Sequence, residues 1–533
     1  MTRVPEDRDP MDLSEAPITG GHPARELPAN TRFVIVGSGF AGLCMAIKLK
    51  QAGHHDFVIL EKGDDVGGTW RENTYPGAAC DIQSHLYSFS FELNPKWSRM
   101  FARQPEILDY LRHCVREYEL EDHLYFGVRF DSGTWDDAAR RWRVKLGGAG
   151  VGGGTGTGTG TGNGTGTGTG TTELTADFVV LGMGPLHRPL LPNVPGIADF
   201  QGPSWHSAEW RHDVDLTGKR VAVIGTGASA IQFVPRVAEQ AAQVVLFQRT
   251  PAWIMPKRDR HISGPTKALY RNLPGFQRAH RTLIYWTAES RAMGFVNPKF
   301  MKVAEGVANA HRKRQVRDPD LARRLKPDYT MGCKRVLISN DFYPALGRDH
   351  VTLVDQGVKE IRGNSVVAAD GTEHEVDVII YGTGFHVTDA FDAIDMVGPA
   401  GRSLKQDWSG GLAAYYGMTV AGFPNMFILV GPNTGLGHNS IVFMIEAQTA
   451  YLMKLLALAR ERGAATVAPT ERAQRRFNEG IHRALATQVW SAGGCQSWYL
   501  DENGRNTTIW PGFTWRYWSR TRKPDQSAYC FER

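Results

Sequence analysis

The sequence predicts an α/β protein built from two Rossmann-like dinucleotide-binding domains, the second inserted into the first, with a helical subdomain attached. Two glycine-rich motifs carry this prediction: Gly37-Ser-Gly39-Phe-Ala-Gly42 and Gly225-Thr-Gly227-Ala-Ser-Ala230. Each follows an apolar run typical of a buried strand and precedes a helical pattern, which is the order of a strand–loop–helix unit. One GxGxxG string is common by chance, but two in this setting indicate a protein that holds two dinucleotides at once.

Length and composition are those of a globular chain of about two to three domains. Charged residues make up 22% of the 533 residues, and the net charge is only +6. The stretch richest in arginine and lysine, residues 312–324, alternates with apolar and acidic residues, so we expect a solvated helix face and no nucleic-acid partner. The N-terminus lacks an apolar signal core and the chain lacks an apolar run of roughly 18 residues, so we expect no membrane insertion and a cytoplasmic location.

The cysteines give no pairing pattern. The six are Cys44, Cys80, Cys114, Cys333, Cys495 and Cys530, and none stands in a CxxC or CxxxxC spacing. We therefore expect neither a metal site nor a redox dithiol, and a reducing compartment.

The patterns of strand, helix and loop divide the chain into four parts. Residues 1–30 are polar and are expected to form a flexible tail. We expect the first part of one dinucleotide domain at 31–182, the second domain at 183–376 with a helical insert at about 256–328, and the rest of the first domain with the C-terminal tail at 377–533. Residues 147–172 are almost pure Gly-Thr repeat and are expected to be a disordered loop at a hairpin tip. The tail is rich in aromatic residues and is expected to pack on the rest of the protein.

One register distinguishes the two nucleotide sites. In such a unit the second strand ends at the residue that meets the adenosine ribose. Glu61 lies 24 positions after Gly37, and Arg249 lies the same 24 positions after Gly225. A carboxylate accepts hydrogen bonds from ribose hydroxyls and repels a 2′-phosphate, whereas a guanidinium offers that phosphate a fork. The first site is therefore expected to take FAD and the second NADPH; the alternative for both residues is an exposed charge at a strand end.

Two further motifs resemble the signatures of Baeyer–Villiger monooxygenases. The longer signature is matched by Gly67-Gly68-Thr69-Trp70, Tyr75-Pro76-Gly77 and Asp81, and the shorter, FxGxxxHxxxW, by Phe200, Gly202, His206 and Trp210. The resemblance runs from about residue 31 to the C-terminus, outside the Gly-Thr repeat. The chain departs from it at Arg211, where the family usually has Pro or Asp, and we expect this to affect a loop rather than the chemistry.

The resemblance implies an FAD-dependent enzyme that uses NADPH and O2 to insert one oxygen atom next to a ketone carbonyl through a C4a-peroxyflavin, giving an ester or lactone. It places the catalytic arginine at Arg335, with Asp81 as the carboxylate that pairs with it. Lys334 resembles a second contact to the NADPH 2′-phosphate. A fixed cation suits this chemistry because negative charge develops during the reaction, and arginine keeps its proton in a dry pocket. From residue type alone, a surface Lys-Arg pair and a lone loop aspartate remain open.

Other site residues follow from the same resemblance. Trp70 and Tyr87 are expected to pack against the flavin, and His206 to couple the motion of the domains, with a structural histidine as the alternative. Gly182 and the turn at Tyr381-Gly-Thr-Gly384 resemble the crossovers between domains, and Gly431-Pro-Asn433 precedes a helix-like run whose N-terminus is expected to face the flavin. The remaining expected cofactor contacts are Gly39, Phe40, Gly42, Lys62, Thr69, Gly227, Ala228, Ser229, Gln232 and Thr250.

Three rival interpretations share part of this evidence. A flavin-containing monooxygenase that oxidises nitrogen or sulfur has both glycine motifs, but Trp210, Asp81 and Arg335 favour ketone oxidation. A disulfide-reductase-like flavoprotein would need a closely spaced cysteine pair. A non-catalytic nucleotide sensor is disfavoured by the joint presence of Arg249, Lys334, Arg335 and Asp81.

Overall fold

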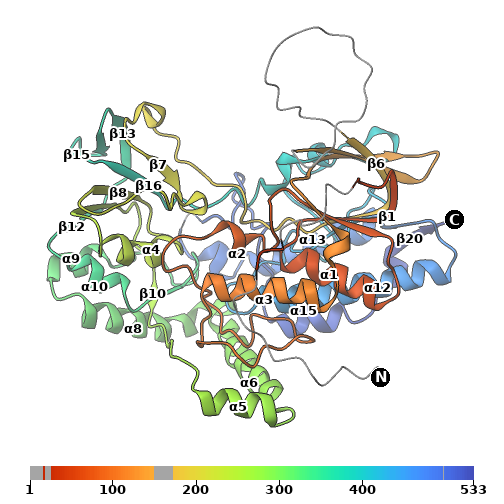
Figure 1. Ribbon diagram of the computed structural model, residues 1–533, viewed down its shortest axis with the longest axis horizontal. Helices are drawn as coiled ribbons and strands as arrows, with labels where there is room; N and C mark the ends of the chain where they lie inside the picture. Colours follow the sequence, from red (N-terminus) through yellow and green to blue (C-terminus); the bar gives the residue numbers. More distant parts are fainter. Residues whose placement is uncertain (1–15, 19–25, 149–171, 496) are drawn as a thin grey trace, which may run out of the picture.

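The computed structural model describes residues 16–18, 26–148, 172–495 and 497–533, and it contains two separate sheets of the dinucleotide-binding kind (Figure 1). The first sheet has the order β17-β4-β5-β6-β1-β2-β3, with β18 paired to β6. Its central strands β1, β2 and β6 run parallel, while β4, β5 and β6 form an antiparallel meander. The bounds are β1 Asn30–Val36, β2 Phe57–Glu61, β3 Leu124–Phe126, β4 Arg129–Asp136, β5 Arg141–Gly147, β6 Thr172–Leu181, β17 Asp395–Val397 and β18 Met426–Ile428.

The first sheet forms because its central strands are apolar on both faces. Phe33, Val34 and Ile35 of β1 are fully buried, since helices cover one face and the meander the other. The covering helices are α1 Phe40–Gln51, α3 Gln104–Glu117 and α12 Ile441–Glu461, preceded in the chain by the short α2 Thr69–Glu72. α12 is long and apolar enough to cross a membrane, but here it packs against α1 and α15 as a core helix.

The second sheet is fully parallel, in the order β12-β9-β8-β16-β7. Its strands are β7 Ser204–His206, β8 Arg220–Ile224, β9 Gln243–Phe247, β12 Val351–Val354 and β16 Val378–Tyr381, with α4 Ala230–Val237 and α10 Phe342–Leu346 beside it. A small antiparallel sheet adjoins it, made of β13 Val358–Arg362, β14 Ser365–Ala368 and β15 Glu373–Glu375. The domain boundary expected at residue 376 falls just before β16, so the second sheet itself extends to Tyr381.

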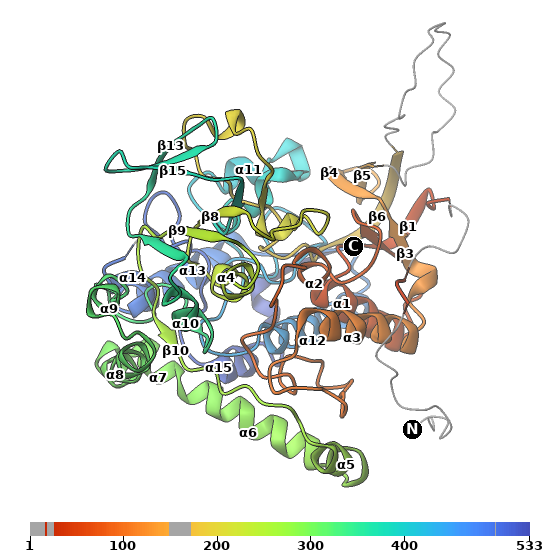
Figure 2. The same ribbon diagram turned by 60° about the vertical axis from the view of Figure 1, so that its left-hand side comes forward.

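The helical insert lies between β9 and β12, and Figure 2 shows its long helices α6 and α8 below the second sheet. Its elements are β10 Ile254–Met255, α5 Gly264–Asn272, α6 Phe276–Ser290, α7 Ala292–Val296, α8 Pro298–Gln315, α9 Pro319–Arg324 and β11 Leu337–Ile338. β10 and β11 pair in parallel, which returns the chain from the insert to the second domain.

The rest of the chain returns to the first sheet, as the expected insertion of one domain in the other requires. After β17 come α11 Leu404–Asp407, β18 and α12, then β19 Thr466–Pro469, α13 Glu471–Leu485, α14 Val489–Ala492, α15 Thr514–Arg520 and β20 Tyr529–Glu532. The aromatic tail only partly packs as expected: Trp510 is buried, whereas Trp498, Trp515 and Trp518 stay about half exposed.

Two expectations fall largely on residues outside the described ranges. β5 and β6 pair antiparallel up to Leu146 opposite Thr172, which confirms the hairpin on either side of the Gly-Thr repeat; residues 149–171 themselves lie outside the described chain. Most of the N-terminal tail does too, but Ile18 is described and buried, and its backbone N–H donates to Asp65 at 3.1 Å.

Candidate active site

The first glycine loop joins β1 to α1 with a backbone that only glycine accommodates. A Cβ on Gly42 would lie 1.9 Å from the Gly37 carbonyl oxygen, and Gly37 itself has φ of 94°. Gly39 and Gly68 approach so closely that a Cβ on Gly68 would lie 3.3 Å from the Gly39 Cα. No side chain caps the first turn of α1, so its N–H groups are available to a phosphate. These features fit the pyrophosphate of a dinucleotide.

Glu61 ends β2, beside the first loop. We expected its carboxylate to bind a ribose, but in the structure this carboxylate already has several partners within the protein. The carboxylate is buried and accepts from the Ser38 N–H at 3.1 Å, the Ser38 hydroxyl at 2.7 Å and the Gly63 N–H at 2.9 Å. It also pairs with Arg71 at 2.7 Å. Burial alone would raise the pKa of Glu61, but the nearby Arg71 charge and these hydrogen bonds outweigh it, so the pKa is lowered and the group stays ionised. Arg71 follows Trp70 directly, and no motif of the sequence indicates its pairing with Glu61.

The aromatic residues of the first unit surround the loop. Trp70 donates its indole N–H to the Tyr87 hydroxyl at 3.2 Å, and Tyr87 meets Phe40 edge-on with ring centroids 5.1 Å apart. Burial raises the pKa of Tyr87, so its hydroxyl stays protonated. Thr69 begins α2 beside them. Lys62, by contrast, is exposed and pairs with Glu72 at 3.1 Å.

The second glycine loop repeats this design at β8 and α4. Gly225 has φ of 106°, and a Cβ there would lie 2.5 Å from the Gly382 carbonyl oxygen. α4 also begins without a side-chain cap, at Ser229, and Gly227 and Ala228 are exposed beside it. The loop is thus open for a second phosphate group. Gly382 belongs to the Tyr381–Gly384 turn that the sequence indicated as a crossover.

The two cations expected at the 2′-phosphate lie near each other. Arg249 is exposed at the end of β9, beside Thr250. The Lys334 ammonium lies 5.3 Å from the centre of the Tyr329 ring. Burial lowers the pKa of Lys334, and the positive charge of Arg249 lowers it further. Two cations that repel each other in this way are suited to share an anionic ligand.

Gln232 does not point to an open nucleotide site, although the sequence suggested a cofactor contact. Its carbonyl oxygen accepts from the Tyr75 hydroxyl at 3.1 Å and the Ala79 N–H at 3.2 Å, and its amide donates to the Ala79 oxygen at 3.0 Å. All of these partners belong to the loop of the longer signature. Gln232 therefore ties α4 of the second unit to the first unit, and sequence spacing of 153 to 157 residues gave no signal of it.

Arg335 and Asp81 form the ion pair that the resemblance implies. The guanidinium donates from Nε at 2.9 Å and from a terminal nitrogen at 2.5 Å, both to Asp81 Oδ2. The side chains are 31% and 29% exposed, so the pair is neither sealed in the core nor free in solvent. Asp81 raises the pKa of Arg335 further above its already high ordinary value, which keeps the cation charged at every working pH.

Tyr499 completes the surroundings of this pair. The side chain is fully buried, and its hydroxyl has no hydrogen-bond partner among the described residues. Burial raises the pKa of Tyr499 to about 12, and the nearby Arg335 charge opposes that shift. An unpartnered buried hydroxyl beside a partly open ion pair fits a place where a ligand binds. Sequence reasoning named the surrounding aromatic stretch without separating Tyr499 from it.

The shorter signature, residues 200–210, includes β7, the strand at one edge of the second sheet. His206 ends β7, is buried, and accepts from the Ala208 N–H at 3.2 Å through Nδ1. Burial lowers the pKa of His206 to about 4, so it is neutral near pH 7. Trp210 packs on Trp205 and Phe233, and a Cβ on Gly202 would lie 2.4 Å from the Asp377 oxygen.

Phe200 begins this signature and Arg211 follows directly after it. Phe200 packs on the second sheet beside Val376 and Ile379. Arg211, the departure from the signature, is exposed and donates to Asp213 at 2.8 Å.

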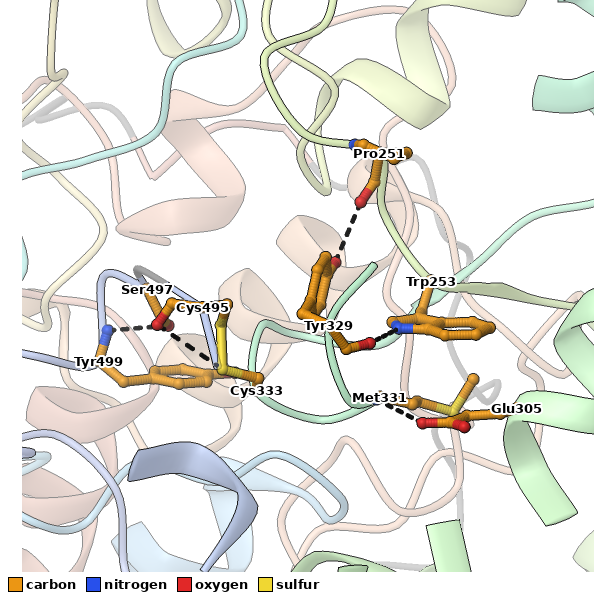
Figure 3. Close-up of a disulfide and its surroundings, with 9 residues drawn as sticks. All are labelled: Pro251, Trp253, Glu305, Tyr329, Met331, Cys333, Cys495, Ser497 and Tyr499. Atoms are coloured by element: carbon orange, nitrogen blue, oxygen red, sulfur yellow. Dashed lines mark hydrogen bonds between the residues drawn. A yellow bond between two sulfur atoms is a disulfide. The ribbon is translucent and has the colours of Figure 1, made fainter. Parts of the chain in front are cut away.

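The cysteine prediction was wrong at one pair. Cys333 and Cys495 form a disulfide with a Cα–Cα distance of 6.1 Å across a sequence separation of 162 residues (Figure 3). Pairing at such a distance is set by the tertiary fold and leaves no spacing motif. Cys44, Cys80 and Cys114 are buried free thiols and Cys530 is an exposed one.

A buried carboxylate that sequence reasoning missed fixes the helical insert to the C-terminal segment. Glu289 of α6 accepts from the Thr514 N–H at 2.5 Å and hydroxyl at 2.8 Å, and from the Asn439 amide at 2.6 Å. His438 lies 3.6 Å away. Asn439 in turn precedes Ser440, whose hydroxyl caps α12. The network thereby holds the start of α12, which follows the Gly431-Pro-Asn433 stretch as expected.

Two family models match the chain. One, described as an NAD(P)-binding Rossmann-like domain, covers residues 35–104, which hold the first glycine loop and Asp81. The other, described as flavin-binding monooxygenase-like, covers residues 165–277, which hold the shorter signature, the second glycine loop and Arg249.

Named relatives match over nearly the whole length. A Baeyer-Villiger monooxygenase of Pseudomonas aeruginosa is 46% identical over 500 residues, covering 93% of this chain and 91% of the relative. A Baeyer-Villiger monooxygenase of Streptomyces coelicolor is 45% identical over 502 residues, covering 94% and 92%. Among solved structures, OTEMO in complex with FAD and NADP has a TM-score of 0.81 at 26% identity, covering 94% of this chain and 99% of that one.

Proposed function

Since the chain belongs to the Baeyer–Villiger monooxygenases, we propose that Arg335 and Asp81 form the charged centre at which it oxygenates its substrate. The protein is an FAD- and NADPH-dependent enzyme that inserts one oxygen atom of O2 next to a ketone carbonyl, giving an ester or lactone. The second oxygen atom leaves as water, and NADPH is oxidised to NADP+. The carrying observation is the Arg335–Asp81 pair, partly open and bordered by a buried hydroxyl without a partner.

Arg335 supplies a fixed positive charge where negative charge develops. As the carbonyl carbon is attacked, electron density moves onto the carbonyl oxygen, and a preorganised cation stabilises that charge without reorganising solvent. Asp81 raises the pKa of Arg335, so the guanidinium does not lose its proton in a dry site. Lysine would be a poorer choice there, because its pKa falls readily on burial.

Asp81 orients the guanidinium. Both hydrogen bonds go to a single carboxylate oxygen, which fixes the plane of the guanidinium and leaves other N–H groups for the reacting oxygens. The second carboxylate oxygen is not engaged by Arg335. Tyr499, a buried side chain of the C-terminal segment, lies close enough to the pair for the Arg335 charge to act on its hydroxyl.

The two glycine loops and their neighbours hold the cofactors. Bound FAD, once reduced by NADPH, supplies the activated oxygen. Gly37, Gly39 and Gly42 admit its pyrophosphate at the first loop, and Trp70 and Tyr87 form the aromatic wall beside it. At the second loop Gly225 and Gly227 admit the pyrophosphate of NADPH, while Arg249 and Lys334 bind the 2′-phosphate.

The proposal extends to the substrate and to the location of the enzyme. The partner is a small-molecule ketone together with O2, and the ion pair lies beside Tyr499, a member of the buried aromatic cluster between the helical insert and the C-terminal segment. The enzyme works as a soluble protein in the cytoplasm, with the apolar helix α12 in its core.

The test compares Arg335→Ala with wild type in FAD content, flavin reduction and product formation. We expect FAD binding and reduction by NADPH to persist, while ketone oxygenation falls by at least about 10²–10³-fold, the effect of removing one transition-state donor. Products are identified by mass spectrometry after incubation with a ketone panel and labelled dioxygen. Arg335→Lys, which keeps the charge without the fork, is the matched control and should retain more activity. Ordinary oxygenation by Arg335→Ala would remove this residue from the mechanism, and labelled sulfide or amine products alone would favour the heteroatom-oxidising alternative.

A further inference from the structure

The disulfide joins two stretches of chain that border Arg335. Cys333 lies two positions before Arg335, in the loop that also carries Lys334, and Cys495 lies four positions before Tyr499. Figure 3 shows the bond between the loop and the C-terminal segment. The loop belongs to the NADPH-binding unit and the segment follows α14 of the flavin-binding unit, so the bond crosses between the two units.

The surrounding backbone is shaped for the two sulfurs to meet. A Cβ on Gly493 would lie 2.5 Å from the Cys333 Cβ and 3.0 Å from its sulfur, so a larger residue at 493 would displace Cys333. Thr330 donates its backbone N–H to the Gly493 oxygen at 3.1 Å. Among the described residues, this is the backbone hydrogen bond that joins loop and segment, and the disulfide is their covalent tie.

The two sulfurs differ in access. Cys333 is 1% exposed, whereas Cys495 is only partly buried. Thiol–disulfide exchange needs an accessible sulfur, so reagents reach the pair through Cys495. The Cys333 sulfur lies 3.7 Å from the Cys495 carbonyl oxygen. It has no proton to donate while the disulfide exists, but as a thiol it can donate to that oxygen, so the geometry accommodates both states.

We propose that Cys333 and Cys495 are a reversible redox pair whose disulfide holds the Arg335 loop against the C-terminal segment and whose dithiol form releases it. The oxidant is hydrogen peroxide: the Cys495 thiolate attacks one peroxide oxygen, the O–O bond breaks, and a sulfenic acid and a hydroxide ion form, and the hydroxide takes a proton from solvent to give water. The Cys333 thiol then attacks that sulfur and expels a second water, forming the disulfide. A small dithiol reverses this by attacking Cys495, expelling the Cys333 thiolate, and closing its own disulfide to free Cys495.

The consequence concerns the Arg335 site and rests on the role proposed above for that residue. Opening the disulfide frees the segment that carries Tyr499 to move away from the ion pair, which leaves the Arg335 guanidinium less firmly positioned. A small displacement of a positioned charge lowers rates strongly, by up to about 100-fold for roughly 1 Å. The dithiol enzyme therefore oxygenates the ketone more slowly and yields less ester per NADPH oxidised.

The first test follows the bond itself, without activity. Full-length FAD-loaded enzyme is treated with hydrogen peroxide or with dithiothreitol, alkylated, digested and analysed by mass spectrometry. We expect a cross-linked peptide pair containing Cys333 and Cys495 after peroxide, and both peptides alkylated after dithiothreitol. Cys530, an exposed free thiol, is the internal control for alkylation in both samples. Free thiols at both positions after peroxide would overturn the proposal.

The second test measures ester formed per NADPH and kcat/KM for a ketone in the two states. Wild type should lose roughly tenfold in kcat/KM on reduction, within the range that a misplaced charge produces, and should recover after reoxidation. Cys495→Ser should match the reduced enzyme and ignore both reagents, while Cys530→Ser should respond as wild type does. An unchanged wild type with a verified open disulfide would overturn the proposal. If Arg335→Ala instead keeps ordinary oxygenation, the proposed function fails, yet the mass-spectrometric result still decides whether the redox pair exists.

Discussion

Arg249 is the residue expected to distinguish NADPH from NADH. It lies exposed at the end of β9 and has no carboxylate partner among the described contacts, so its fork is available for the 2′-phosphate. Arg249→Ala should raise KM for NADPH by about 10–100-fold, since hydrogen bonds to charged groups contribute about 1.5–3 kcal/mol. KM for NADH should change little. Steady-state kinetics with both cofactors make the comparison, and equal changes for the two would contradict the assignment.

Lys334 gives the same site a dependence on pH. Burial and the Arg249 charge lower the pKa of Lys334, so it loses its proton at a lower pH than an ordinary lysine. The charged form is the one that binds phosphate and exists below this pKa. NADPH affinity should therefore be full at lower pH and decline as pH rises through the lowered pKa.

The measurement is KM for NADPH as a function of pH between neutral and alkaline values. Lys334→Arg is the matched control, because arginine stays protonated over this range and should flatten the decline. NADH, which lacks the 2′-phosphate, should show no such decline in wild type. A decline of equal size for NADH, or in Lys334→Arg, would assign the effect to another group.

At the residue scale, a contact could be predicted only where a motif or the family resemblance named both of its partners. The Arg335–Asp81 pair spans 254 positions, and only the family resemblance places its members together, because Asp81 belongs to the longer signature and Arg335 to neither. The structure bears out their contact and the neighbourhood of Arg249 and Lys334. Arg71, Tyr499 and the Cys333–Cys495 pair belong to no local pattern, because their partners are brought together by tertiary folding. Glu61 was predicted as a ribose contact, and its pairing with Arg71 could not be read from spacing.

At the scale of elements, a buried carboxylate of α6, Glu289, joins this helix to the C-terminal segment. Glu289 accepts three hydrogen bonds from Thr514 and Asn439, which start α15 and precede α12. Burial alone would raise the pKa of Glu289, but the nearby His438 and the hydrogen bonds from Thr514 and Asn439 outweigh it and lower the pKa. Glu289→Ala should destabilise the fold by about 3–5 kcal/mol, as when one partner of a buried charged network is removed.

Thermal or denaturant unfolding of the FAD-loaded enzyme measures this loss. Glu289→Gln keeps the shape and should lose less. Because the pKa of Glu289 is lowered on folding, its stabilising contribution is present above the ordinary pKa of a glutamate and disappears as pH falls through the lowered value. The difference between wild type and Glu289→Gln should therefore shrink in acid. Unfolding of Glu289→Ala at the wild-type midpoint would show that the carboxylate does not hold α6.

Element prediction succeeded where apolar periodicity and glycine loops coincide. The strand–loop–helix units at Gly37 and Gly225, and the hairpin strands flanking the Gly-Thr repeat, lie where the sequence places them. The domain boundary near residue 376 depends instead on strand pairing. The sequence of β16 predicts a buried strand but does not say which sheet this strand joins. Its pairing with β7 and β8 places it in the second sheet.

At the scale of the whole molecule, the loop of the longer signature lies between the two dinucleotide units. Tyr75 and Ala79 bond to Gln232, Asp81 pairs with Arg335, and Arg99 pairs with Asp259 at 2.9 Å. Residues 75–99 of the flavin unit thus contact three separate parts of the NADPH unit with its insert, namely α4, the Arg335 loop and the stretch after β10. The family resemblance predicts one of these contacts, the Asp81–Arg335 pair, but neither signature gives any sign of the bonds to Gln232 or Asp259.

Gln232 is the uncharged part of that contact, so it separates the orientation of the two units from the chemistry of the ion pair. Gln232→Ala removes three hydrogen bonds to Tyr75 and Ala79 without touching Arg335. FAD content and NADPH affinity should stay near wild type, while transfer of hydride from NADPH to FAD should slow by roughly tenfold or more, because that step needs the two cofactors held at a fixed distance. Stopped-flow absorbance at the flavin band measures the rate.

Tyr75→Phe, which removes only one of the three bonds, should slow the step less. A raised NADPH Kd with an unchanged reduction rate would instead place Gln232 in the nucleotide site, where the sequence alone had put it.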